Sequence, residues 1–82
     1  MGYFLVIYRY MNSKEDQIAL GELGAILKAA REKLGLSQVQ VAAKAKVNAN
    51  YYAIVERGES NLTYLKLHRI MKVLNIKSLN IS

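Results

Sequence analysis

Amide and cationic side chains recur between residues 38 and 57 of this 82-residue chain. An asparagine such as Asn50 can make two hydrogen bonds to the edge of adenine, and alanine or isoleucine can contact the methyl group of thymine. Lysines such as Lys44 and Lys46 can neutralise phosphates, and Tyr51 can hydrogen-bond a phosphate or stack on a base. The chemistry available here is therefore recognition of a nucleic acid by hydrogen bonds and charge.

The chain lacks the residue sets that catalysis and metal binding require. It has no cysteine and one histidine, His68, which no other ligand residues accompany. No paired nucleophile and base, and no phosphate-cradling glycine loop, can be recognised. We therefore expect no enzymatic activity, no cofactor and no metal site, and we place His68 at the surface.

The charge balance is basic, because 12 lysines and arginines stand against 6 acidic residues and give a formal net charge of +6. Such a balance favours a polyanionic partner, although it also promotes solubility without any partner. The longest N-terminal apolar run, Tyr3 to Tyr8, is followed by Arg9 and is far shorter than the roughly 20 residues of a membrane helix. Because the sequence shows neither a signal-peptide pattern nor a membrane-spanning segment, we expect one small cytoplasmic domain.

Residues 36–58 predict two short helices joined by a tight turn. Ser37 suits the N-cap of the first helix, and Gln40 stands where a capping box needs Glu or Gln. Asn48 suits the N-cap of the second helix, and Gly58 suits the position that closes it. This pair is typical of a helix-turn-helix, in which the first helix braces the second in the major groove of DNA.

The second helix of this pair, Ala49 to Arg57, should have two different sides. Tyr52 and Val55 lie on the side that should face the core. The opposite side should face outward, with Tyr51 towards its edge, and it consists of Ala49, Asn50, Ala53 and Ile54. An outward side of this composition can read bases through one amide and several apolar contacts.

An amphipathic pattern precedes this pair of helices. It should begin near Ser13, where Asp16 completes a capping box, and end at Gly35. Gly24 weakens the helix but can permit close packing against a neighbouring helix. The apolar stripe recurs at steps of three and four residues: Leu20, Leu23, Leu27, Ala30 and Leu34.

A second amphipathic pattern follows the pair. It should begin at Thr63, with Asn61 as the competing N-cap, and end at Asn75. Its buried stripe consists of Leu67, Ile70, Met71 and Leu74. Residues 76–81 can add one further turn. The chain is therefore expected to be all-α, with four to five short helices.

We expect residues 1–12 to form a separate apolar arm in front of a helical domain that occupies residues 13–82. The segment Tyr3 to Met11 is aromatic and β-branched, and this composition predicts a short strand. Three interpretations remain open. The strand pairs with the same segment of a second copy in a dimer, or it lies on the helical domain. In the third interpretation, Met11 is the natural first residue and the ten residues before it are an extension of the reading frame.

Taken together, these motifs resemble the Cro/C1-type helix-turn-helix family of phage repressors, small bacterial regulators and antitoxins. The resemblance covers about Leu20 to Ile76 and implies a lambda-repressor-like DNA-binding domain. It is carried by Leu23-Gly24, Arg31-Glu32-Lys33-Leu34-Gly35-Leu36-Ser37-Gln38, Val41-Ala42 and Val55-Glu56-Arg57-Gly58.

The resemblance implies roles for individual residues. Gln38 matches a glutamine that contacts a phosphate and supports the recognition helix. Arg31 and Glu56 match a pair that forms a salt bridge between the first and third helices. Arg57 and Asn61 match the loop after the recognition helix, where contacts to the DNA backbone are expected.

The run from Glu56 to Thr63 also resembles the controller proteins of restriction-modification systems, which are small dimers that switch on their own operon and the endonuclease. The sequence departs from the family pattern at two places within the helix-turn-helix motif, and its C-terminal tail is shorter than in relatives that dimerise through a full fifth helix. Lys46 stands where the turn usually has glycine, so a left-handed conformation there costs about 1 kcal/mol. Ala49 and Ile54 are apolar where relatives often carry polar side chains, so specificity depends more on DNA shape.

We therefore expect a homodimeric transcription regulator that binds a palindromic operator in double-stranded DNA, with half-sites about one helical turn apart. The alternative is an antitoxin or other protein-binding module that neutralises a partner through Tyr3 to Met11 and regulates its own gene. The residues expected to bind DNA are Gln38, Lys44, Lys46, Asn48, Ala49, Asn50, Tyr51, Ala53, Ile54, Arg57 and Asn61.

Overall fold

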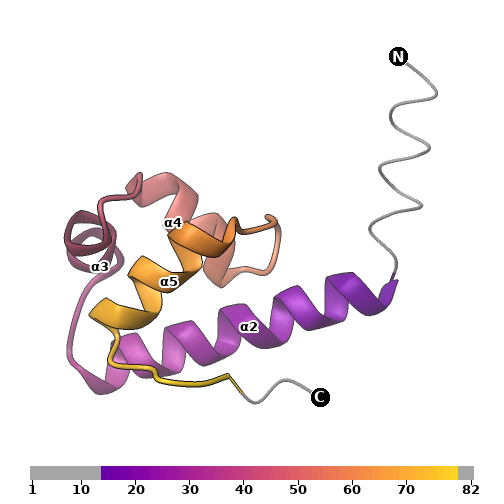
Figure 1. The fold of residues 1–82 in the computed structure, drawn as a ribbon, viewed down its shortest axis with the longest axis horizontal. Coiled ribbons are helices and arrows are strands. Elements are labelled where there is room, and N and C mark those ends of the chain that lie inside the picture. The colour runs from indigo at the N-terminus through magenta and orange to yellow at the C-terminus, as the bar shows by residue number, and fades with distance from the viewer. Residues whose placement is uncertain (1–13, 80–82) are drawn as a thin grey trace.

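The computed structural model describes residues 14–79, which form four helices and no strand (Figure 1). The expected all-α architecture is confirmed for this part of the chain. The predicted strand Tyr3 to Met11 and the predicted cap Ser13 lie outside the described residues. The helices are α2 (Lys14–Lys33), α3 (Gln38–Ala45), α4 (Ala49–Glu56) and α5 (Tyr64–Val73).

The helix starts agree with the caps read from the sequence. The Ser37 hydroxyl accepts from the backbone N–H of Gln40 at 3.0 Å, and the Gln40 side chain accepts from the N–H of Ser37 at 2.8 Å. The capping box of α3 is therefore confirmed. Thr63, not Asn61, is the N-cap of α5, because its hydroxyl accepts from the N–H of Lys66 at 3.3 Å.

Each of the four helices is followed, one or two positions after its last residue, by a residue with positive φ: Gly35, Lys46, Gly58 and Asn75. In each case the following backbone N–H donates back into the last turn, as when Val47 donates to the carbonyl of Ala42 at 3.0 Å. Lys46 takes this left-handed conformation with φ 59° and ψ 43°, so the turn keeps its geometry without the usual glycine.

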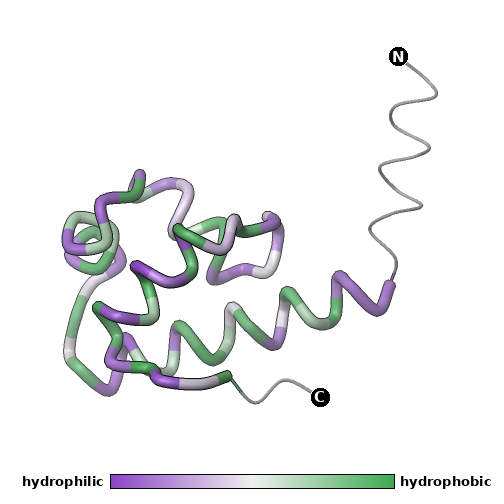
Figure 2. Tube along the Cα trace, in the orientation of Figure 1, coloured by the Kyte–Doolittle hydropathy of each residue, from purple (hydrophilic) through white to green (hydrophobic). Residues whose placement is uncertain are grey.

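The core lies where α2, α3, α4 and α5 meet. Tyr52 and Val55 of α4 are buried as expected, beside Leu27 of α2 and Ile70 of α5. The full set of buried apolar residues is Leu23, Leu27, Val41, Ala42, Ala45, Tyr52, Val55, Ile70 and Leu74. In Figure 2, hydrophobic and hydrophilic residues alternate along each helix, as expected for helices with one buried side.

Two expectations for apolar residues were wrong. Leu34 does not extend the buried stripe of α2 and is 47% exposed, because the helix ends at Lys33 and the chain turns at Gly35. Residues 76–79 contain no further helical turn, because the N–H of Ile76 closes α5 by donating to Met71. Ile76 and Leu79 nevertheless pack against the core, and residues 80 and 81 of the predicted turn lie outside the description.

Close packing of α2 on α4 depends on Gly24. A Cβ atom built there would come within 2.7 Å of the Val55 carbonyl oxygen and still closer to that of Glu56. These atoms are backbone atoms, so the two helices would have to separate to admit a methyl group. Gly24 therefore fixes the distance between α2 and α4.

We expect Gly24→Ala to destabilise the protein by about 1–3 kcal/mol, as overpacking does elsewhere. Gly21→Ala is the matched control in the same helix, because a Cβ at Gly21 meets no atom within 4 Å. It should stabilise the protein by about 0.5–1 kcal/mol, since alanine favours a helix more than glycine does. Urea denaturation of both variants measures these changes, and effects of the same sign would contradict the packing argument.

We expect Lys46→Gly to raise the free energy of unfolding by about 0.5–1 kcal/mol. Glycine removes the strain of the left-handed conformation, and its greater freedom in the unfolded chain cancels part of that gain. The matched control is Lys44→Gly, which removes the same charge from a helical position and should cost up to about 1 kcal/mol. Thermal unfolding should separate the two variants by several degrees, in opposite directions from the parent protein.

Candidate DNA-binding surface

The carboxylate of Glu56, the last residue of α4, is held by two side chains from other helices. Glu56 is 8% exposed. Arg31 of α2 donates from Nε to Oε2 at 2.7 Å and from Nη2 to Oε1 at 3.1 Å, so the pair is bidentate. Gln38 of α3 donates from Nε2 to Oε1 at 3.0 Å. The ion pair expected between Arg31 and Glu56 is thus present, and Gln38 joins it.

This network controls the ionisation of Glu56. Burial by itself raises the pKa of the carboxyl, but the hydrogen bonds from Arg31 and Gln38 and the positive charge of Arg31 together hold that pKa below its usual value. The hydrogen bonds with Glu56 also raise the pKa of Arg31. The Arg31 Nη1 group donates to the Leu36 carbonyl at 2.9 Å, which ties the loop before α3 to the same site.

Tyr52 lies beneath this network. Its hydroxyl is buried close to Glu56, and it makes no hydrogen bond of good geometry within residues 14–79. Burial, reinforced by the negative charge of Glu56, raises the pKa of Tyr52 far above its usual value. The hydroxyl therefore stays protonated, and Tyr52 belongs to the core side of α4.

The outer side of α4 is only partly as expected. Asn50 is exposed, and Ala53 and Ile54 are half-buried. Ala49 was expected to face outward, but it packs partly against the core because it lies three residues before Tyr52, on the same side of the helix. Tyr51 also packs partly against the core, four residues before Val55.

The Tyr51 ring makes a cation–π contact with a lysine from another helix. The Lys66 ammonium of α5 lies 4.4 Å from the ring centroid, so the contact joins α4 to α5. Burial raises the pKa of Tyr51, and its hydroxyl therefore remains a hydrogen-bond donor at neutral pH. Sequence reasoning had not connected Lys66 with Tyr51, because no local pattern links residues on different helices.

The polar residues predicted to contact DNA at the two ends of α4 and in the following loop differ in exposure and in the contacts they make within the protein. The Asn48 Oδ1 atom caps α4 by accepting from the N–H groups of Asn50 and Tyr51 at 2.8 and 3.1 Å, so only its amide hydrogens can contact DNA. Arg57 follows α4 and is exposed, and its Nε lies 3.2 Å from the Glu59 carboxylate. Asn61 is exposed in the next loop.

Two further cations of the predicted set lie at the other end of the motif. Lys44 and Lys46 line a shallow hollow together with Arg69, Lys72 and Val73 of α5. Arg69 donates from Nε to the Ala45 carbonyl at 3.0 Å, which fastens α5 to the end of α3. Sequence reasoning gave no sign of this contact, because the two residues are 24 positions apart and lie on different helices.

The helix-turn-helix family model matches residues 27–80. The chain belongs to the helix-turn-helix family. This helix-turn-helix protein is also similar to the crystal structure of the restriction-modification controller protein C.AhdI from Aeromonas hydrophila, with a TM-score of 0.69 and 29% identity over 71% of this chain and 88% of that chain. No curated protein matches the sequence.

Membership of this family supports DNA binding and transcription regulation as the coarse function of the helix-turn-helix protein. Among the described helices, none combines the length and the apolar character that crossing a lipid bilayer requires. Residues 14–79 contain no group of three or more side chains able to hold a metal ion.

We expect Glu56→Gln to lower the free energy of unfolding at neutral pH by about 1–3 kcal/mol, because Arg31 loses a charged partner in a mostly buried site. The sign of the pH effect follows from the lowered pKa of Glu56. Its stabilisation is present above the pKa of about 4.3 of an unfolded glutamate and is lost as the pH falls through the lower folded value.

The difference in the free energy of unfolding between the parent protein and Glu56→Gln should therefore shrink as the pH falls below about 4. Urea denaturation at a series of pH values measures this difference. Glu59→Gln is the matched control, since Glu59 belongs to an exposed ion pair whose net contribution is small. A gap between parent and Glu56→Gln that stays constant down to the lowest pH would show that the Glu56 charge is not the stabilising group.

Proposed function

We propose that the chain binds duplex DNA sequence-specifically, as a homodimer, with α4 in the major groove. The observation that carries this proposal is the fixed position of α4 with Asn50 exposed on it. Its buried side carries Tyr52 and Val55, and its C-terminal residue Glu56 is held by α2 and α3. A helix held in this way can enter a groove without losing orientation.

Base reading is assigned chiefly to Asn50. Its side chain can donate to and accept from adenine, which is the usual pairing of asparagine in the major groove. Ala53 and Ile54 supply apolar contacts to thymine methyl groups. Ala49 and Tyr51, being partly packed against the core, contact DNA at the margin of the surface, where the Tyr51 hydroxyl can donate to a phosphate.

Backbone contacts are assigned to residues at both ends of the motif. Gln38 gives one amide hydrogen to Glu56 and keeps the second for a phosphate. Asn48 can likewise use its amide group while its oxygen caps α4. Lys44, Lys46, Arg57 and Asn61 complete the set that positions the protein without reading sequence.

The similarity to C.AhdI supports a more specific role as a controller of a restriction-modification system. The run Glu56-Arg57 followed by Asn61-Leu62-Thr63 supports the same role. A homodimer requires a palindromic operator with two half-sites about one helical turn apart. Selection of bound sequences from a random DNA pool would give both the operator and this spacing, and selected sites without a repeated half-site would contradict the dimer.

On the selected operator, Asn50→Ala should weaken binding by about 1–3 kcal/mol and leave binding to random DNA almost unchanged. The reason is that a base contact contributes only on the correct sequence, whereas phosphate contacts contribute on all. Fluorescence titration on both DNAs measures the two affinities. Lys28→Ala, an exposed change on α2, serves as the control, and equal losses on both DNAs would remove Asn50 from the base-reading set.

A further inference from the structure

A basic hollow lies between the ends of α3 and α5. Its lining consists of Lys44 and Lys46, from the end of α3, and Arg69, Lys72 and Val73, from α5. The hollow has a volume of about 400 Å³ and is open to solvent. Four of its five lining residues are cations and none is acidic, so the hollow concentrates positive charge in a concave surface.

Nearby negative charge does not balance these cations. The ion pairs within residues 14–79 are Arg31–Glu56 and Arg57–Glu59, and neither includes a residue of the hollow. The partial negative charges at the C-terminal ends of α3 and α5 are the remaining counterparts, and Arg69 already donates to the Ala45 carbonyl at the end of α3. The positive charges of Lys44, Lys46 and Lys72 are therefore not neutralised by an ion pair within residues 14–79.

The structure also restrains two of these cations. Arg69 is anchored by its hydrogen bond to α3, and Lys46 leaves the backbone at a residue whose φ and ψ are set by the turn. Such anchoring lowers the entropy lost on binding an anion, compared with four cations on separate flexible segments. An anion in the hollow also relieves the mutual repulsion of the lysines.

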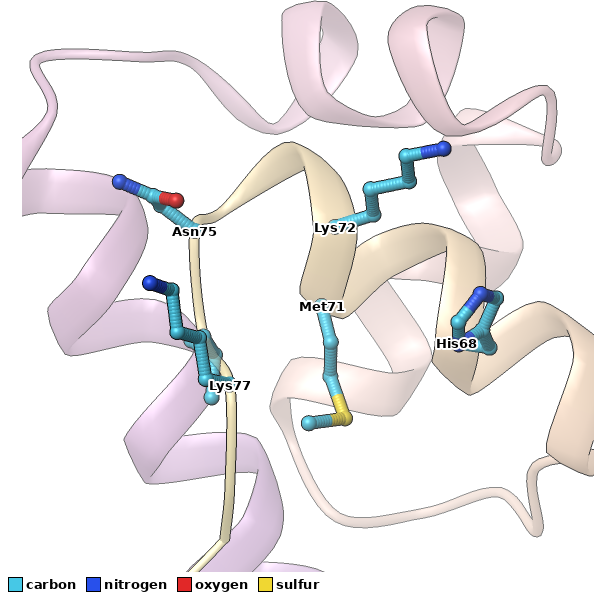
Figure 3. Close-up of a pocket in the computed structure, with 6 residues that line it drawn as sticks. His68, Met71, Lys72, Asn75 and Lys77 are labelled. Atoms are coloured by element: carbon cyan, nitrogen blue, oxygen red, sulfur yellow. The ribbon is translucent and has the colours of Figure 1, made fainter.

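A neighbouring hollow, which shares Lys72 with the basic hollow, is chemically different. Its lining includes Met71, Ile76 and Asn75 beside Lys72 and Lys77. Figure 3 shows Lys72 and Met71 pointing in opposite directions from α5. Lys72 lines both hollows, but of these two the second has a mixed, partly apolar lining, whereas the basic hollow is lined mainly by cations.

We propose that the hollow formed by Lys44, Lys46, Arg69 and Lys72 binds phosphate groups. The phosphate comes either from the sugar-phosphate backbone of bound DNA or from a free phosphate ester such as a nucleotide. The DNA source rests on the proposed function and adds Arg69 and Lys72 to the residues that contact the backbone. If the phosphate belongs to a free ester, the hollow is a ligand site that is independent of the major-groove contacts.

The test uses the full-length protein and its Lys44→Gln and Lys72→Gln variants, with Lys28→Gln on α2 as the control for loss of an equal charge elsewhere. Arg69 is changed only to lysine, which keeps its charge, because Arg69 also holds α3 and α5 together. Thermal unfolding of each variant checks that the fold is kept before binding is measured.

The first measurement is the salt dependence of DNA affinity. If DNA phosphate occupies the hollow, each glutamine variant should reduce the slope of log affinity against log salt by up to about 0.9, on operator and random DNA alike. The second measurement is a titration with inorganic phosphate followed by NMR. Occupation by free phosphate should shift the backbone amides of residues 44–47 and the Nε–H of Arg69.

A reduced slope supports DNA phosphate, and an unchanged slope with saturable shifts at the hollow supports a free phosphate ester. An unchanged slope without such shifts overturns the proposal, as does an equal effect of Lys28→Gln in both measurements. The Asn50→Ala test is independent of these results, because Asn50 does not line the hollow. Failure of base reading and failure of phosphate binding are therefore distinguishable.

Discussion

The carboxylate of Glu56 is the point on which the arrangement of the helices depends. A charge that is 8% exposed is costly to bury, and here Arg31 from α2 and Gln38 from α3 compensate the lost hydration. Removal of any member would leave polar groups without partners in a mostly buried site, so the network holds one arrangement of the helices. The charge thus fixes α4 relative to both α2 and α3.

Close backbone packing makes this network possible. Gly24 lets α2 approach the carbonyl groups of Val55 and Glu56. Gly58, which follows α4, lies against Gly21 of α2. With α2 and α4 at this distance, Arg31 reaches the carboxylate in bidentate geometry. An ion pair and a steric fit therefore position α4 together. The proposed base reading requires this, since a small displacement of Asn50 would lose the paired hydrogen bonds that we assign to it.

The structure separates two properties of a DNA-binding protein. Under the proposed function, the exposed side of α4 carries one amide for base reading, that of Asn50, among apolar residues, which limits direct readout of sequence. The cations are grouped instead at the end of α3, along α5 and after α4. On this proposal, affinity from charge and specificity from base contacts reside in different elements, which is the usual division between positioning and reading in DNA-binding proteins.

The sequence alone determined the features that arise within a few residues. It predicted the caps at Ser37 and Asn48, the helix end at Gly58 and the burial of Tyr52, because capping and helical periodicity act over three or four positions. The tertiary structure alone decided which distant groups meet: Gln38 with Glu56, Arg69 with the Ala45 carbonyl, and Lys66 with Tyr51. These partners lie on different helices, and their distances depend on packing that no local pattern records.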